Sequence, residues 1–236
     1  MARFSGAILA WDDYEGGDWD TYISYAHRFL SESERRGGSY QDAYFRSTLA
    51  VIEAARGNDA RAREEAAHAV ELARALGEPQ VVLPALASAA VVATETGQLD
   101  RAKEYVQEWL DGSTRHRLAP RTGSGMAALM VALLADRLGI TAELRALTEA
   151  AAARDRWAEV ARAAVDGDYL TAAELAAAIQ HRPLEARARL RAAEALLASG
   201  DRASADAQLA RSLAFWRAVA ARRYIREGER LLAATA

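Results

Sequence analysis

The sequence predicts an all-α fold of about six helical hairpins stacked in series and closed by a last helix. The chain is 51% hydrophobic, but 58 of its 236 residues are alanine and only 7% are aromatic. Such a composition is typical of closely packed helices. Glycines recur every 30 to 40 residues or so, an interval typical of stacked two-helix repeats. Small and apolar residues around them follow the three-and-four spacing of helices.

Six glycines mark the expected turn inside each hairpin. They are Gly17, Gly57, Gly97, Gly139, Gly167 and Gly200. The short turn between two antiparallel helices often needs a positive φ, which glycine adopts without strain. A polar residue such as Asn58 follows most of them and can cap the second helix. Small residues then recur, as at Ala62 and Ala66, so that the two helices can approach closely. The pattern fits Gly139 poorly.

The first three hairpins are predicted at residues 3–15 with 18–35, 40–56 with 58–76, and 79–96 with 98–111. In the first hairpin the second helix begins just after Gly17, and in the second hairpin it begins just after Gly57. The third hairpin has the clearest first helix, because Leu86, Ala89 and Ala93 form one helical stripe.

The remaining helices are predicted at residues 122–138 with 140–151, 153–166 with 168–180, 183–199 with 201–220, and 222–234. Pro183 suits a helix start, and Gly167 and Gly200 each precede an aspartate. The closing helix places Ile225 and Leu232 on one side and Arg226 on the other, as a capping element should.

Taken together, these elements predict a right-handed α-solenoid that forms one domain over residues 1–236. The longest predicted loop, residues 112–125, is the one plausible sub-boundary. Because the chain begins in mid-pattern at Phe4, Ile8 and Trp11, we expect it to be the C-terminal piece of a longer protein.

The whole chain resembles tetratricopeptide-like solenoids, although its period is irregular. Its last third, including residues 187–197, 200–209, 213–219 and 223–232, resembles the C-terminal ends of large bacterial signal-transduction ATPases. These include STAND and LuxR-type regulators and ATPase-linked nucleotide cyclases. The family's nucleotide-binding motif and catalytic residues are missing from this sequence, so the resemblance implies a sensor or scaffold region, not an enzyme.

The composition of the chain argues against several classes of site and partner. Without cysteine the chain has no disulfide or thiolate site, and this is compatible with the cytoplasm. A net charge of −3 argues against a nucleic-acid partner. No apolar run approaches the roughly 20 residues of a membrane helix. We expect no cofactor, and a protein or peptide as the partner.

The first helices of the hairpins should line the concave face of the solenoid and bind the partner there. Aromatic side chains suit such a groove because they offer a large area with a polar handle. The candidate groove residues are Phe4, Trp11, Tyr14, Tyr44, Ser47, Val51, Arg154, Trp157 and Arg187. The alternative for the tryptophans is that they fill gaps between helices, which we favour for Trp19, Trp109 and Trp216 on second helices.

Three other hypotheses remain open. One is a small-molecule inducer sensor with a closed pocket. A remote one is a metal-dependent all-α enzyme that uses Asp12 and Asp13, since paired carboxylates can hold Mg²⁺. The third is a phosphate site in the basic loop, against the simpler interpretation as a solvated linker; its residues are Arg115, His116, Arg117 and Arg121. The four histidines are scattered and are expected at the surface or in the groove.

Overall fold

The fold is all-α in a computed structural model that describes residues 2–116, 124–152 and 155–233, with side chains omitted at 2–8, 124 and 150–152. Fourteen helices and no strand occur in these ranges, which confirms the predicted class. The helices are α1 (Ala2–Gly16), α2 (Trp19–Glu34), α3 (Gln41–Arg56), α4 (Asp59–Leu76), α5 (Pro79–Glu95), α6 (Leu99–His116), α7 (Ser124–Ala132), α8 (Ala135–Leu138), α9 (Thr141–Ala152), α10 (Arg156–Val165), α11 (Tyr169–Ala178), α12 (Arg182–Ala198), α13 (Arg202–Ala218) and α14 (Arg222–Ala233).

Most helices begin and end close to the predicted residues, and two places differ. The helix predicted at 122–138 is divided into α7 and α8 by a turn at Leu133 and Leu134. Helix α6 continues to His116, so the first part of the loop predicted at 112–125 is helical. The sub-boundary is also crossed by one hydrophobic cluster, which contains Trp109 before it and Leu129 after it.

The hairpin turns follow the predicted chemistry. All six glycines have a positive φ, between 71° and 93°. Asp18, Asp168 and Asp201 each cap the next helix by accepting a hydrogen bond from a backbone N–H three residues on. Asn58 does not, because its side-chain amide donates to Glu53 over 2.6 Å.

The helices form an inner and an outer layer. Within the inner layer α3 packs on α5, α5 on α7 and α7 on α10. Helices α3, α5 and α12 are buried on most sides, whereas α4 buries a stripe of small residues that includes Ala62, Ala66 and Ala69. Small residues in this stripe allow the close approach that the sequence predicted.

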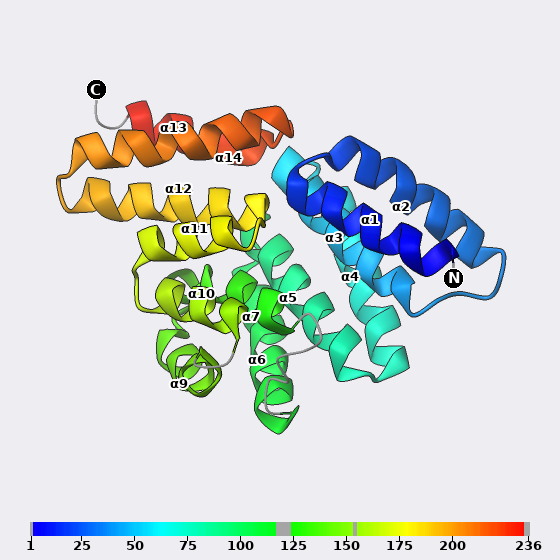
Figure 1. Cartoon of the computed structure of the whole chain (residues 1–236). Coiled ribbons are helices and arrows are strands. Elements are labelled where there is room, and N and C mark those ends of the chain that lie inside the picture. Colours follow the sequence, from blue (N-terminus) through cyan, green and yellow to red (C-terminus); the bar gives the residue numbers. More distant parts are fainter. Residues whose placement is uncertain (1, 117–123, 153–154, 234–236) are drawn as a thin grey trace.

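The two ends of the chain meet along a seam (Figure 1), which we define as the contact of α1–α3 with α12–α14. Trp19 of α2 lies edge-on to Phe215 and beside Trp216 of α13, with ring centroids 6.0 and 6.2 Å apart. On the other side of the seam, the Arg223 guanidinium donates to the Ala54 carbonyl over 2.9 Å and pairs with Asp59. The stack of helices is therefore closed on itself.

Candidate functional site: the inner aromatic cluster

Four predicted groove residues meet on the inner side of the molecule around a histidine. Trp11 lies edge-on to Tyr44 at 6.2 Å and to Tyr14 at 6.4 Å. His181 lies edge-on to Tyr14 at 5.7 Å and to Trp157 at 5.6 Å. We call Trp11, Tyr14, Tyr44, Trp157 and His181 the inner aromatic cluster. Edge-to-face pairs at these distances add attraction to the burial of the rings.

His181 is fully buried at the start of α12, which corrects the expectation that it lies at the surface or in an open groove. Its Nδ1 accepts a hydrogen bond from the Leu184 N–H over 3.3 Å and so caps α12. Burial lowers the pKa of His181 to about 3, so the ring is neutral. The proton then belongs on Nε2, which has no hydrogen-bond partner among the described residues. The sequence could have suggested a cap, since His181 stands just before Pro183 near the expected helix start.

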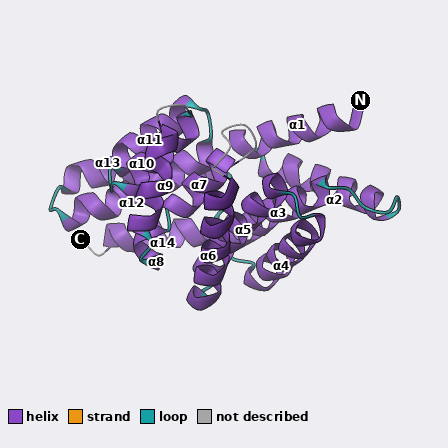
Figure 2. Ribbon diagram, turned by 90° about the horizontal axis from the view of Figure 1, so that it is seen from below, coloured by secondary structure: helices purple, strands orange, loops and turns teal. Residues whose placement is uncertain are grey.

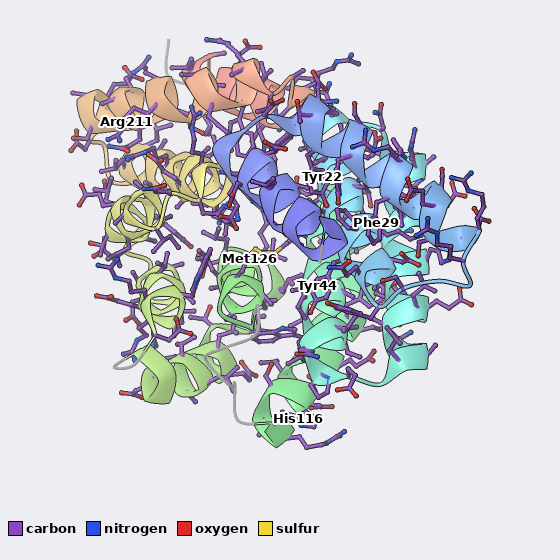
Figure 3. The ribbon with its side chains drawn as sticks, turned by 45° about the vertical axis from the view of Figure 1, so that its right-hand side comes forward. Tyr22, Phe29, Tyr44, His116, Met126 and Arg211 are labelled. Atoms are coloured by element: carbon purple, nitrogen blue, oxygen red, sulfur yellow. The ribbon has the colours of Figure 1, made fainter. Side chains whose placement is uncertain are left out.

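A small cavity of about 20 Å³ lies against the cluster. Its polar walls are Tyr14, Thr48, Ser88 and His181, and its apolar walls are Val51, Met126, Met130 and Leu184. Figure 3 shows Tyr44 and Met126 near α1, on the inner side of the molecule. A cavity of this size holds about one water molecule. A larger ligand would therefore need one wall to move.

The predicted groove residues are less accessible than an open groove would make them. Tyr14, Ser47, Val51 and Arg187 are at most 8% exposed, and Val51 belongs to the hydrophobic cluster that α3 shares with α5 and α7. The Ser47 hydroxyl donates to the Ala43 carbonyl within α3. Trp11, Tyr44 and Trp157 are half-buried.

The structure does not describe the side chains of two predicted groove residues. Phe4 lies in α1, but its side chain is outside the described part, and Arg154 lies outside the described residues. The three tryptophans expected to fill gaps, Trp19, Trp109 and Trp216, are at most 2% exposed and belong to the core.

Arg187 belongs to a second inner feature, a charged cluster made by α5, α8, α12 and α14. Its guanidinium donates to Glu95 over 3.1 Å and lies over the Tyr224 ring at 5.5 Å. The Tyr224 hydroxyl donates to the same Glu95 oxygen over 3.2 Å. Burial and the neighbouring Glu95 raise the pKa of Glu227, which pairs with Arg137. Because these charges are matched, the cluster is suited to holding α12 and α14 against α5 and α8.

The described residues give no support to the other predicted sites. No group of three His, Cys, Asp or Glu side chains in the described part could hold a metal ion, and Asp12 and Asp13 are no exception. In the basic loop, Arg115 and His116 are exposed at the end of α6, and Figure 3 labels His116 there. Arg117 and Arg121 lie outside the described residues.

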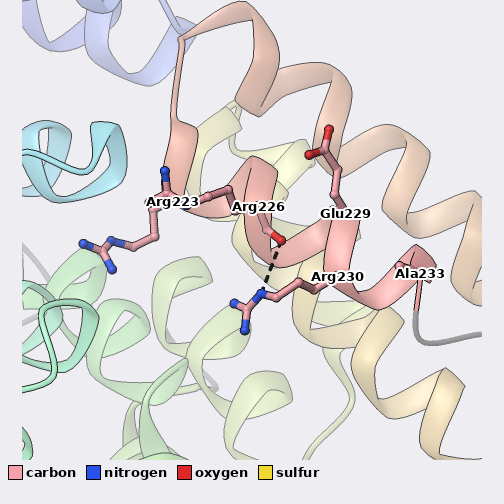
Figure 4. A pocket seen from close by; sticks show the side chains of 5 residues that line it. All are labelled: Arg223, Arg226, Glu229, Arg230 and Ala233. Carbon is pink, nitrogen blue, oxygen red and sulfur yellow. Dashed lines mark hydrogen bonds between the residues drawn. The ribbon is translucent and has the colours of Figure 1, made fainter.

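The outer surface carries an arginine-rich hollow of about 440 Å³ on α14, lined by Arg223, Arg226, Glu229, Arg230 and Ala233. Figure 4 shows that these side chains all come from this one helix. The Arg230 Nε donates to the Arg226 carbonyl over 3.4 Å, and Glu229 pairs with Arg217. Because the Glu229 carboxylate also lines this hollow, it repels anions and partly offsets the attraction of the three arginines.

No described helix is both long enough and apolar enough to cross a membrane. No protein-family model matches the chain, and comparisons with curated proteins and with solved structures find no match.

Proposed function

We propose that this chain is a non-catalytic interaction module of a bacterial regulatory protein in the cytoplasm, and that it binds a protein or peptide partner at the inner aromatic cluster. The observation that carries this proposal is the meeting of aromatic side chains from α1, α3 and α10 around His181. Aromatic side chains contribute much of the energy of protein interfaces, because they bury a large area with little loss of freedom.

The interpretation as a right-handed, tetratricopeptide-like solenoid of about six hairpins belongs to the same proposal. It is supported by the buried small residues of the second helices and by the positive-φ glycine in each hairpin turn. In such a stack the inner helices present side chains from distant parts of the sequence on one face. Tyr14 of α1 and Trp157 of α10 meet at His181 in this way.

The half-buried members of the cluster are where a partner would make first contact. The Tyr44 hydroxyl donates to the Gln80 carbonyl over 2.5 Å, which fixes the ring on the rim of the inner side. Tyr44 and Trp157 therefore offer a preorganised apolar surface to an incoming peptide, with less ordering cost than mobile side chains would require.

The test uses peptides selected for binding to the whole chain from a displayed random library. Isothermal titration then compares the wild type with Trp11→Ala and Tyr44→Ala. We expect Tyr44→Ala to weaken binding roughly tenfold, because truncating an aromatic contact at an interface centre commonly costs more than 1 kcal/mol. Leu170→Ala is the control, since this exposed side chain of α11 is not a member of the cluster. Unchanged affinity in both aromatic variants would remove the cluster as the binding site.

A second candidate, the small-molecule sensor, is favoured by the polar walls of the small cavity and by the unpartnered Nε2 donor of His181, and it requires one wall to move so that the ligand fits. A metabolite bound there should raise the melting temperature, and Ser88→Ala should reduce that rise because the hydroxyl lines the cavity. A thermal-shift screen without any stabilising metabolite would instead favour the protein partner.

A further inference from the structure

Helix α1 differs from the inner helices that follow it. Helices α3, α5, α7 and α10 pack on one another in sequence, whereas α1 packs mainly on α2 and α12. Figure 2 shows α1 along one edge of the molecule. Its position is therefore that of a helix laid onto the stack.

Two aromatic side chains on one face hold α1 there. Trp11 contacts Tyr44 of α3, and Tyr14, one turn later, contacts His181 and forms one wall of the small cavity. Residues three apart lie on the same side of a helix. The opposite side is open: Leu9 is 63% exposed, and Asp12 is exposed.

The same two rings of α1 also contact Tyr22 and Trp19 of α2, and beside these contacts the described part of α1 borders a hollow. This hollow of about 420 Å³ lies along the line where α1 meets α2, with Leu9, Ala10 and Asp13 on one wall and Asp20 and Tyr25 among the residues of the other. The last turns of α1 carry acids and no basic residue, which opposes the helix dipole. Burial, together with the nearby charges of Asp18 and Asp12, raises the pKa of Asp13. Isolated helices of this length are marginal in water, so α1 depends on its docking.

The connection to α2 can act as a hinge. Gly16 is followed by Gly17, whose φ is +93°. The Gly16 carbonyl accepts one hydrogen bond from Arg182 of α12 over 2.9 Å, and the Tyr14 carbonyl accepts one from the Trp19 indole over 3.2 Å. Among the residues whose side chains are described, a movement of α1 away from the stack would break these two hydrogen bonds, the ring contacts of Trp11 and Tyr14 and the packing of Ala10.

We propose that α1 is an internal occupant of the surface that Tyr44 and His181 form, and that the partner is an amphipathic helix with two aromatic side chains three residues apart that binds in place of α1. This inference rests on the proposed function and specifies its partner. The helix already seated on Tyr44 and His181 shows which shape and chemistry this surface accepts. The bound partner would make the contacts with Tyr44 and His181 that Trp11 and Tyr14 make now. Because α1 must first leave this surface, the apparent affinity depends on the fraction of molecules in which α1 is undocked.

The first test uses a fluorescein-labelled synthetic peptide with the sequence of residues 2–16 and follows its binding to the full chain by fluorescence anisotropy. The two variants act in opposite directions if α1 and the peptide exchange. Tyr44→Ala removes a contact of the bound peptide and weakens binding, whereas Trp11→Ala weakens the internal competitor and strengthens binding several-fold. Weaker binding in Trp11→Ala would overturn the exchange. So would undiminished binding by a peptide in which alanine replaces both aromatic residues.

The second test holds α1 in place without altering the cluster. Asp13→Cys and Ser24→Cys put one thiol on each wall of the hollow between α1 and α2, and no other cysteine competes for the reagent. A bis-maleimide with a disulfide in its spacer then joins the helices. We expect the linked chain to bind the peptide at least tenfold more weakly, with recovery after the spacer is reduced.

Equal affinity before and after reduction would overturn the exchange, as would absence of peptide binding in the reduced form. These outcomes differ from failure of the proposed function. Library-selected peptides that bind the linked chain and depend on Tyr44 would refute the exchange and leave the proposed function standing.

Discussion

At the scale of single residues, burial decides the chemistry of the two inner features. The two ring nitrogens of His181 have different surroundings. Nδ1 accepts a hydrogen bond from a backbone N–H, whereas Nε2 has no hydrogen-bond partner among the described residues. Arg187 and Glu95 are both nearly inaccessible, and each compensates the charge of the other. The sequence identified Arg187 by its place in a repeat but not its partner, since Glu95 stands 92 residues away. It did not single out His181, because its place before Pro183 indicates at most a helix cap and says nothing of the rings packed on it.

The buried neutral ring of His181 should make the protein less stable in acid. Its pKa in the folded state is about 3, below the ordinary 6.5. The unfolded chain therefore takes up a proton below pH 6.5 while the folded chain does not. Stability is complete above that pH and is lost as the pH falls toward 3. At pH 5 the loss is about 2 kcal/mol.

Urea unfolding at pH 7.5 and pH 5 of the wild type and of His181→Asn measures this loss, because asparagine can still cap α12. The variant should lose about 2 kcal/mol less than the wild type between the two pH values. His68→Asn, at an exposed site on α4, is the control. Equal losses in wild type and His181→Asn would show that this histidine is not held neutral.

Removing the charge of Arg187 should be far more costly than removing a surface arginine. Arg187→Met leaves Glu95 buried with reduced compensation, which commonly costs about 3–5 kcal/mol. Arg211→Met breaks a pair with Glu185 in which the arginine is 58% exposed, and should cost less than about 1 kcal/mol. Guanidinium-induced unfolding compares the two, and adding Glu95→Gln to Arg187→Met should recover part of the loss. Equal effects of the two arginine variants would contradict a matched buried pair.

At the scale of helices, the sequence was most informative where structure depends on neighbouring residues. Turns such as the one at Gly57 and caps such as Asp201 involve atoms only a few residues apart, so a local pattern predicts them. The break at Leu133 and Leu134 and the extension of α6 to His116 carry no such pattern. Both are decided by packing against other helices, which outweighs local preference.

Gly125 shows a packing constraint of this kind. It stands in a stretch that the sequence assigned partly to a loop, and a Cβ atom there would lie 2.3 Å from the Trp157 Cβ. Gly125→Ala should force α7 and α10 apart and cost about 1–3 kcal/mol or more. Thermal unfolding should show a lower melting temperature, and quenching of tryptophan fluorescence should report a more accessible Trp157. Gly16→Ala is the matched control, because nothing lies within 4 Å of its added carbon.

At the scale of the whole molecule, the seam between the chain ends is what sequence reasoning did not predict. A repeat pattern describes contacts between neighbours, and an open groove is its simplest extension. The seam depends instead on pairs such as Trp19 with Trp216 and Ala54 with Arg223, which are far apart in the chain. Nothing local distinguishes these residues from other core residues, so the pattern predicted their burial but not their partners.

The seam should contribute to stability through coupling between its two sides. Trp216→Ala removes a fully buried ring and should cost about 3–5 kcal/mol. Combined with Trp19→Ala, it should show a coupling free energy of about 0.5–1.5 kcal/mol beyond the separate effects. Urea unfolding of both single variants and the double variant gives this value. Strict additivity would mean that the two sides of the seam do not stabilise each other.

A closed seam changes how such a stack opens and how it forms. In an open array each repeat depends only on its neighbours, so the terminal repeats fray first. Here Arg56 donates to the Val219 carbonyl across 163 positions, so each end shields the other. Amide exchange in α2 and α13 should then be nearly as slow as in α5, because all three open only when the molecule unfolds as a unit. Such distant contacts form late and slow the search for the native state, so slow, cooperative folding is the kinetic counterpart of the closed stack.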